Sequence, residues 1–237
     1  MTAVPSPSPA AAPAAAAAPA EVVEPLIYRV GRLMCRPWAD LWFDLKVYNP
    51  HYVPRTGGVL VVANHQSYLD PILLTVKIPR PFSFLAKSEL FENPFFDWLI
   101  RNLNAFPVRQ GAGDVGAVKE TIARLQEGHA LILYPEGTRS LDGEIGPMQA
   151  GVGLIVRRAG VPVVPAVIEG SFDAWRPKSG KIFRPHPVRV MYGPPLDLGN
   201  LKANQIVQKI DAKLHEMLAE LRAREPELNK RRQRRRI

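Results

Sequence analysis

The sequence predicts a single α/β domain with a central, mostly parallel sheet flanked by helices. From residue 55 onward, short apolar runs alternate with amphipathic segments of helical periodicity, which is the pattern of an α/β fold. We find no internal repeat and no domain boundary within residues 50–224. With 237 residues, 46% of them hydrophobic, the chain is large enough to bury a sizeable core.

Apolar runs bounded by Gly, Pro or polar residues predict the strands. These strands cover residues 58–63, 82–86, 105–108, 130–134, 163–168 and 188–192. Apolar residues at helical spacing predict the helices. One helix starts near residue 71, and the others cover residues 94–103, 115–127, 151–159 and 204–224. Gly128 and Gly160 follow two of these helices, as helix-ending glycines do.

The segment 23–45 carries apolar residues at helical spacing, and we expect Pro37 to split it into two short helices or to kink it. Apolar, tryptophan-bearing and basic faces together favour helices that lie in a membrane interface. The alternative is an ordinary helix packed on the core. The aromatic and basic residues of the segment are Trp38, Trp42, Arg29, Arg32 and Arg36.

Composition limits the function classes. The net charge is +9, but six positive charges lie in residues 230–236, so the rest of the chain has a net charge of only about +3 and no overall nucleic-acid-like surface. The basic tail could bind anionic lipid or nucleic acid, or stay solvated. No stretch of about 18 uncharged apolar residues occurs, so no transmembrane helix is expected. The single cysteine, Cys35, excludes an internal disulfide and suggests a reducing compartment.

These observations divide the chain into four segments. Residues 1–22 are an Ala- and Pro-rich arm that we expect to be disordered, and residues 23–48 form the amphipathic membrane-interface helices. Residues 49–224 form the α/β domain, and residues 225–237 form the basic tail.

The first candidate site is the pair His65 and Asp70, five residues apart in the turn between a predicted strand and a predicted helix. Such a turn brings both side chains to one sheet edge. There a carboxylate can hold the imidazole in one tautomer while the other ring nitrogen accepts a proton. The alternative is a structural role, because Asp before Pro is a good helix cap and Ser67 could begin a capping arrangement.

Further polar residues follow other predicted strands. Arg109 comes just after the strand 105–108, and the turn 134–140 follows the strand 130–134. Sites in open α/β sheets gather beyond the carboxyl ends of the strands, so these residues could converge with His65. Arginine suits phosphate through its bidentate geometry, and Gly137 lets backbone approach a ligand. Alternatively, Arg139 simply pairs with Glu136, and Arg109 is an ordinary surface residue.

The chain resembles the glycerolipid acyltransferases, in particular bacterial 1-acyl-sn-glycerol-3-phosphate acyltransferases. The resemblance covers about residues 25–220, and four family motifs occur in order within it. They are N-H-x4-D at Asn64, His65 and Asp70; F-x-x-R at residues 106–109; F-P-E-G-T-R-S at residues 134–140, with Tyr134 in place of Phe; and V-P-V-V-P at residues 161–165.

This resemblance implies an enzyme that moves a fatty acyl group from acyl carrier protein or coenzyme A to the free hydroxyl of a lysophospholipid. It implies that His65 is the general base and that Asp70 orients it. Arg109 and Arg139 would bind the acceptor phosphate, while Glu136, Gly137 and Thr138 would shape the acceptor site. Direct transfer without metal or bound cofactor is expected, since no serine or cysteine nucleophile with an adjacent base is visible. The enzyme would work on the cytoplasmic face of the cell membrane, as a peripheral or monotopic protein attracted to its anionic surface.

One departure from the family pattern concerns the acceptor. Family members often carry a lysine where this chain has Gln149, so one phosphate contact is absent and another lysolipid, such as a lyso-aminolipid, is an alternative acceptor. An esterase is a competing hypothesis, but no G-x-S-x-G nucleophile elbow is present. A membrane or nucleic-acid adaptor would explain the basic tail but not the four polar motifs; we expect no nucleic-acid partner.

Overall fold

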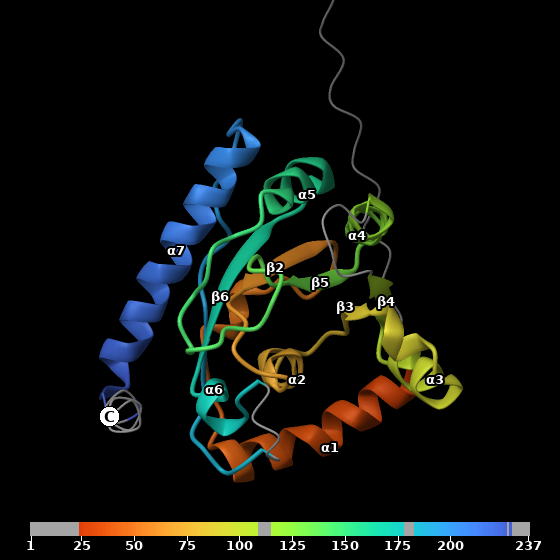
Figure 1. Cartoon of the computed structure of the whole chain (residues 1–237), viewed down its shortest axis with the longest axis vertical. Helices are drawn as coiled ribbons and strands as arrows, with labels where there is room; N and C mark the ends of the chain where they lie inside the picture. The colour runs from red at the N-terminus through yellow and green to blue at the C-terminus, as the bar shows by residue number, and fades with distance from the viewer. Residues whose placement is uncertain (1–23, 109–114, 178–182, 227, 229–237) are drawn as a thin grey trace, which may run out of the picture.

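A seven-stranded sheet forms the centre of the protein in the computed structural model, which describes residues 24–108, 115–177, 183–226 and 228 (Figure 1). The strand order is β1-β7-β6-β2-β5-β3-β4. All neighbouring strands are parallel except β6 and β7, which confirms the predicted fold class. The strands are β1 (Lys46–Tyr48), β2 (Val59–Ala63), β3 (Phe82–Lys87), β4 (Ala105–Val108), β5 (Ala130–Leu133), β6 (Val163–Glu169) and β7 (Arg189–Tyr192).

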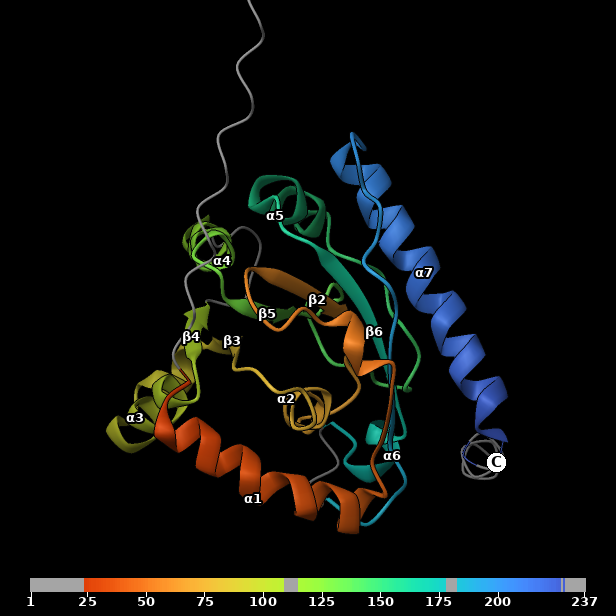
Figure 2. The same cartoon turned by 180° about the vertical axis from the view of Figure 1, so that it is seen from behind.

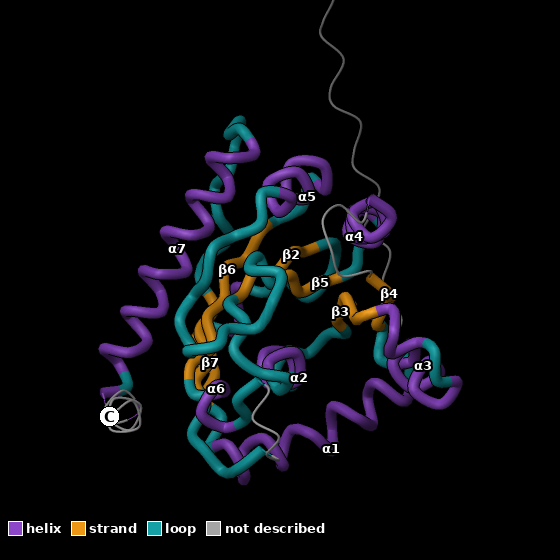
Figure 3. Tube along the Cα trace, in the orientation of Figure 1, coloured by secondary structure: helices purple, strands orange, loops and turns teal. Residues whose placement is uncertain are grey.

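Helices cover both faces of the sheet (Figures 2 and 3). One face packs against α1 (Leu26–Phe43), α2 (Asp70–Thr75) and α6 (Ser171–Ala174). The other face packs against α4 (Val115–Gln126), α5 (Gly151–Ala159) and α7 (Ala203–Arg224). The remaining helix, α3 (Pro94–Asn102), contacts β4 at the edge of the sheet. Short 3-10 turns cover Pro50–Tyr52 and Ser88–Phe91.

The burial of the central strand β2 explains why the sheet needs a layer of helices on each face. Every residue of β2 is buried, and successive side chains point to opposite faces. Val61 therefore joins the core under α1 and α2, while Leu60 and Val62 join the core under α5 and α7. On its two sides β2 pairs in parallel with β5 and β6. The loops that follow β2 and β5 therefore leave the sheet on the same side, at the carboxyl ends of the strands.

The N-terminal segment forms one helix, α1, with Pro37 inside it, so the first of the two alternatives, a split into two short helices, is wrong. Proline removes one backbone hydrogen bond, and its position here is exposed. Buried contacts on both sides of Pro37 hold the helix to the sheet: Ala39 and Phe43 join the core, and the Phe82 N–H donates to the hydroxyl of Tyr28 (3.1 Å). No helix among the described residues is long and apolar enough to cross a membrane.

Two elements lie outside the sequence-based prediction. The strand β1 has only three residues, too few for a recognisable alternation, and α6 has only four. Tertiary contacts hold β1 in place: the buried Arg189 of β7 pairs with Asp44 (2.8 Å) and Glu225 (3.1 Å), and Tyr48 donates a hydrogen bond to Glu225. These ion pairs link the sheet edge to the C-terminal end of α7.

Candidate active site

His65 and Asp70 lie together in the turn between β2 and α2. Nδ1 of His65 is 2.8 Å from Oδ2 of Asp70, whose side chain is completely buried, while the His65 side chain keeps 16% of its surface exposed. A carboxylate only accepts hydrogen bonds, so Nδ1 carries the proton and donates it to Asp70. In the neutral ring Nε2 then has a free lone pair and can accept a proton. The predicted pair is therefore present, with Nδ1 bound to Asp70 and Nε2 left to accept a proton.

The Asp70 carboxylate also organises the turn itself. Oδ2 accepts hydrogen bonds from the backbone N–H groups of Gln66 (2.6 Å) and Ser67 (2.7 Å). The N-cap residue of α2 is Leu69, and no side chain caps this helix. Asp70 is thus not a helix cap; it both contacts His65 and fixes the turn, and its orienting role in the reaction stays a prediction. These three hydrogen bonds to one oxygen fix the carboxylate before any substrate binds.

Asn64 holds the start of this turn against β6. Its side-chain amide donates to the carbonyl oxygen of Ile168 (3.0 Å), and its Oδ1 accepts from the Ile168 N–H (2.8 Å). The amide therefore imitates a strand and extends the pairing of β2 with β6 one residue beyond Ala63. This places His65 directly above the sheet edge. The sequence contained Asn64 in its first motif, but only the structure reveals what it does.

The turn after β5 joins the same edge through Glu136. One carboxylate oxygen of Glu136 accepts from the His65 N–H (2.8 Å), and the other accepts from the Gly146 N–H (2.9 Å). The Ser140 N–H donates to the His65 carbonyl (2.8 Å), so the two loops are linked in both directions. Burial raises the pKa of Glu136, although the two N–H groups oppose this effect. Glu136 shapes the site by fixing loops, and its carboxylate is buried.

The predicted alternative ion pair between Arg139 and Glu136, both described in the structure, is not formed, and the Glu136 oxygens instead accept backbone hydrogen bonds. The guanidinium of Arg139 lies over the ring of Tyr68, with Cζ 3.6 Å from the ring centroid. Stacking occupies the face of the guanidinium and leaves its in-plane N–H groups for an anion. Within the described chain, the Nε atom is buried and has no hydrogen-bond partner. Arg109 lies outside the described residues.

Gly137 and Thr138 form the exposed tip of the turn. Gly137 has φ +70°, a left-handed conformation that favours glycine, and its N–H donates to the Tyr134 carbonyl (3.1 Å). Gln149 lies beside this tip: a Cβ on Gly137 would be 3.2 Å from its Cγ, and its side-chain amide donates to the Glu136 carbonyl at 3.5 Å. Gln149, the position at which the family resemblance led us to expect a lysine, is therefore close to the turn.

Tyr134 covers the imidazole of His65. The two ring centroids are 3.9 Å apart and the ring planes are inclined by only 14°, which is a stacked arrangement. The sequence identified Tyr134 only as a substitution in a motif, because stacking across two loops leaves no pattern in the chain. Among the described residues, no group of three or more His, Cys, Asp or Glu side chains could hold a metal ion. That no metal or bound cofactor is needed stays a prediction.

A His–Asp pair with a completely buried carboxylate and an arginine-bearing turn, together at the carboxyl ends of parallel strands, define the class of α/β enzymes with a polar site beyond the sheet. The Acyltransferase family model matches residues 44–169, more than half of the chain, and the chain belongs to this family. The match spans β1 through β6 and thus contains the complete candidate site.

Two relatives and one solved structure extend this result. The chain is 30% identical over 182 residues to a 1-acyl-sn-glycerol-3-phosphate acyltransferase of Bacillus subtilis, covering 75% of this chain and 87% of the relative. A chloroplastic enzyme described by the same activity, from Brassica napus, is 29% identical over 170 residues, and the match spans about half of its length (49%). The crystal structure of the 1-acyl-sn-glycerophosphate acyltransferase PlsC from Thermotoga maritima superposes with a TM-score of 0.70 at 30% identity, covering 84% of this chain and 81% of that one.

Proposed function

We propose that this protein transfers a fatty acyl group from a thioester, acyl carrier protein or coenzyme A, to the free hydroxyl of 1-acyl-sn-glycerol-3-phosphate, giving phosphatidate. The observation that carries the proposal is the His65–Asp70 pair, fixed at 2.8 Å beside an arginine-bearing turn. Relatives named for this activity support the choice of substrates.

In the proposed reaction, Nε2 of His65 takes the proton of the acceptor hydroxyl as its oxygen attacks the thioester carbonyl. The tetrahedral intermediate then collapses, the carbon–sulfur bond breaks, and the proton on His65 passes to the leaving thiolate. Asp70 keeps Nδ1 protonated throughout and stabilises the imidazolium. Cys35 is a poor candidate for an acyl-enzyme intermediate, since it lies on α1 and burial raises the pKa of its thiol. Direct transfer therefore fits the residues best.

The acceptor phosphate would bind at the turn that follows β5. Arg139 is held over Tyr68 with its guanidinium edge available, and Arg109 is assigned to the same phosphate through its place in the family motif. Gly137 and Thr138 form the exposed tip, where backbone and a hydroxyl can reach the ligand. Glu136 contributes through the loops that it fixes.

A second acceptor class is favoured by one observation. Gln149 lies beside Gly137 and carries an amide instead of a positive charge, so this side of the turn offers a hydrogen bond and no ion pair. A lysolipid with a zwitterionic or amino head group, such as a lyso-aminolipid, needs less positive charge than lysophosphatidate. It is the alternative acceptor for the same acyl-transfer chemistry.

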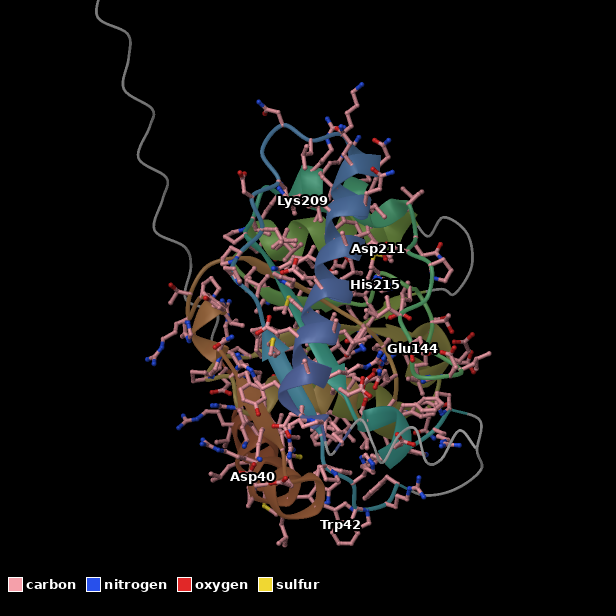
Figure 4. The ribbon with its side chains drawn as sticks, turned by 90° about the vertical axis from the view of Figure 1, so that its left-hand side faces the viewer. Asp40, Trp42, Glu144, Lys209, Asp211 and His215 are labelled. Atoms are coloured by element: carbon pink, nitrogen blue, oxygen red, sulfur yellow. The ribbon has the colours of Figure 1, made fainter. Side chains whose placement is uncertain are left out.

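We also propose that the protein works on the cytoplasmic face of the cell membrane without spanning it. The helix α1 runs along the outer edge of the molecule (Figure 1), and several of its apolar side chains are exposed. Figure 4 places Trp42 at the opposite end of the molecule from Lys209, and Phe95 and Trp98 of the neighbouring α3 are exposed as well. Trp38, however, is half-buried against Phe43 and Phe183. The exposed stripe of α1 comprises Leu26, Val30, Leu33, Met34 and Leu41.

The proposal is tested by incubating the purified protein with acyl thioester and a panel of lysolipids, and by identifying the products by mass spectrometry. We expect thioester consumption to depend on the acceptor and lysophosphatidate to give phosphatidate. Acceptor-independent hydrolysis would indicate an esterase, and no consumption with any acceptor would contradict acyl transfer. A preference for a lyso-aminolipid would select the alternative acceptor.

A further inference from the structure

The aromatic ring of Tyr134 is part of the immediate surroundings of the catalytic imidazole. Tyr134 is the first residue after β5, and β5 pairs directly with β2, which leads to His65. The pairing of the two strands places both rings at the same sheet edge. The ring planes are nearly parallel, and the ring centroids are 3.9 Å apart, closer than those of any other pair of rings described in this structure.

This stack restrains a motion that the hydrogen bond to Asp70 permits. The bond from Nδ1 to Asp70 fixes one edge of the imidazole, but the ring can still tilt about that edge. A second ring at stacking distance fixes its plane. Since Nε2 lies in that plane, the stack also fixes the direction in which the base meets the acceptor hydroxyl. Orientation of this kind matters because displacements of about 1 Å at a reacting atom cost large factors in rate.

The stack also suits the charge that develops during the reaction. His65 becomes an imidazolium when it takes the acceptor proton, and the face of an aromatic ring attracts a cation. The phenol itself stays neutral, because burial, with a contribution from the Asp70 carboxylate, raises the pKa of Tyr134 well above its usual value. Its hydroxyl is buried and has no hydrogen-bond partner within the described residues. The ring face, and not the hydroxyl, is therefore the part of Tyr134 that acts on His65.

We propose that Tyr134 is a positioning residue for the reaction: its ring holds the His65 imidazole in plane and stabilises the imidazolium. The inference rests on the proposed role of His65 as the base. Removing the ring removes both effects, so Tyr134→Leu is expected to lower kcat by about two- to thirtyfold, the range of cation–π contributions. The KM values for thioester and acceptor should not change, because Tyr134 is assigned no contact with either substrate. Tyr134→Phe keeps the ring and should restore most of kcat.

The kinetic test compares wild type, Tyr134→Leu and Tyr134→Phe, with Phe82→Leu as a matched control. Phe82 is a buried aromatic residue of the same core with no ring contact to His65, so its replacement reports the effect of lost packing alone. A Phe82→Leu variant with normal kcat in its folded fraction supports the inference. Normal kcat in Tyr134→Leu, a Tyr134→Phe variant as slow as Tyr134→Leu, or an equal kcat loss in Phe82→Leu would overturn it.

A spectroscopic measurement tests the stack without relying on turnover. The ring current of Tyr134 should displace the imidazole proton signals of His65 in the NMR spectrum. The chain has only five histidines, so the His65 signal can be assigned by its loss in His65→Ala. The signal should move in Tyr134→Leu and stay in place in Tyr134→Phe; an unmoved signal in Tyr134→Leu would overturn the inference. If the wild type transfers no acyl group, the proposed function fails while this measurement still decides whether the stack exists.

Discussion

Several different neighbours hold His65 at once. Asp70 accepts from its Nδ1, the Glu136 carboxylate accepts from its backbone N–H, and Tyr134 covers the face of its ring. These contacts come from two loops that follow adjacent strands, β2 and β5. In the proposed reaction, a base fixed in this way needs little reorganisation when the acceptor binds, which is how positioning lowers a reaction barrier.

Asp70→Asn tests the role of the orienting carboxylate. An asparagine oxygen can still accept from the backbone N–H groups of Gln66 and Ser67, so the turn should persist. The negative charge that stabilises the imidazolium is lost, and we expect kcat to fall by about a hundredfold or more. The measurement is steady-state kinetics together with circular dichroism. A folded variant with near-normal kcat would assign Asp70 to the structure of the turn alone.

Arg139→Lys tests the assignment of the acceptor phosphate. Lysine keeps the positive charge but loses the planar fork and the flat stack on Tyr68, so the apparent KM for the acceptor should rise about tenfold while the KM for the thioester is unchanged. Arg124→Lys is the matched control, since Arg124 also stacks on an aromatic ring, Phe106, but lies on α4. A change confined to the thioester KM would mean that Arg139 serves the donor.

The sequence predicted which residues lie together in the candidate site better than it predicted how they are arranged. His65 and Asp70 were predictable because both lie within one turn, where spacing alone implies proximity. The buried role of Glu136 and the stack of Tyr134 were not, because they depend on how the loops after β2 and β5 pack on one another. The local pattern also allowed an ion pair between Glu136 and Arg139 that the tertiary contacts prevent.

At the scale of elements, long periodic segments were predictable and short ones were not. The helices 115–127, 151–159 and 204–224 agree closely with α4, α5 and α7, because each buries an apolar stripe. The strand β1 was missed because Arg189 and Glu225, distant in sequence, hold it at the sheet edge. Pro37 was overvalued as a helix breaker, since core contacts of α1 on both sides of it offset one lost hydrogen bond.

The packing of α5 on α7 depends on a glycine, which gives a prediction for stability. A Cβ on Gly153 would lie 2.1 Å from the backbone oxygen of Ala203 at the start of α7. Gly153→Ala must therefore push the two helices apart, and we expect a loss of about 1–3 kcal/mol in unfolding free energy. Gly151→Ala is the control, because a Cβ there meets nothing within 4 Å in the same helix. The measurement is thermal or urea unfolding of both variants. Equal unfolding free energies for the two variants would contradict the account.

At the scale of the whole molecule, the exposed stripe of α1 predicts how the protein meets a membrane. Leu33 and Leu41 are 74% and 87% exposed, so replacing either with Glu should leave the fold intact while opposing insertion into lipid. Both variants should sediment less with anionic vesicles than wild type. Leu154→Glu, on α5 away from α1, is the control and should bind as wild type does.

High salt distinguishes the electrostatic contribution to membrane binding from the contribution of apolar insertion. Exposed charges are screened over about 8 Å at physiological ionic strength, whereas apolar insertion persists. High salt should therefore release the wild type only partly from vesicles. Complete release by salt alone, or equal binding of Leu33→Glu and wild type, would show that α1 is only a helix packed on the core. The N-terminal arm and the basic residues 230–236 of the tail lie outside the described residues, so their predicted roles stay predictions.

The most direct test of the central claim compares wild type with His65→Ala in one assay of acyl transfer. Thiol release from an acyl thioester is followed with and without lysophosphatidate, and the lipid product is identified by mass spectrometry. The account predicts acceptor-dependent release with phosphatidate as product, and a fall of about a hundred- to ten-thousandfold in the folded His65→Ala variant. Near-normal transfer by that variant would contradict the assignment of His65 as the base.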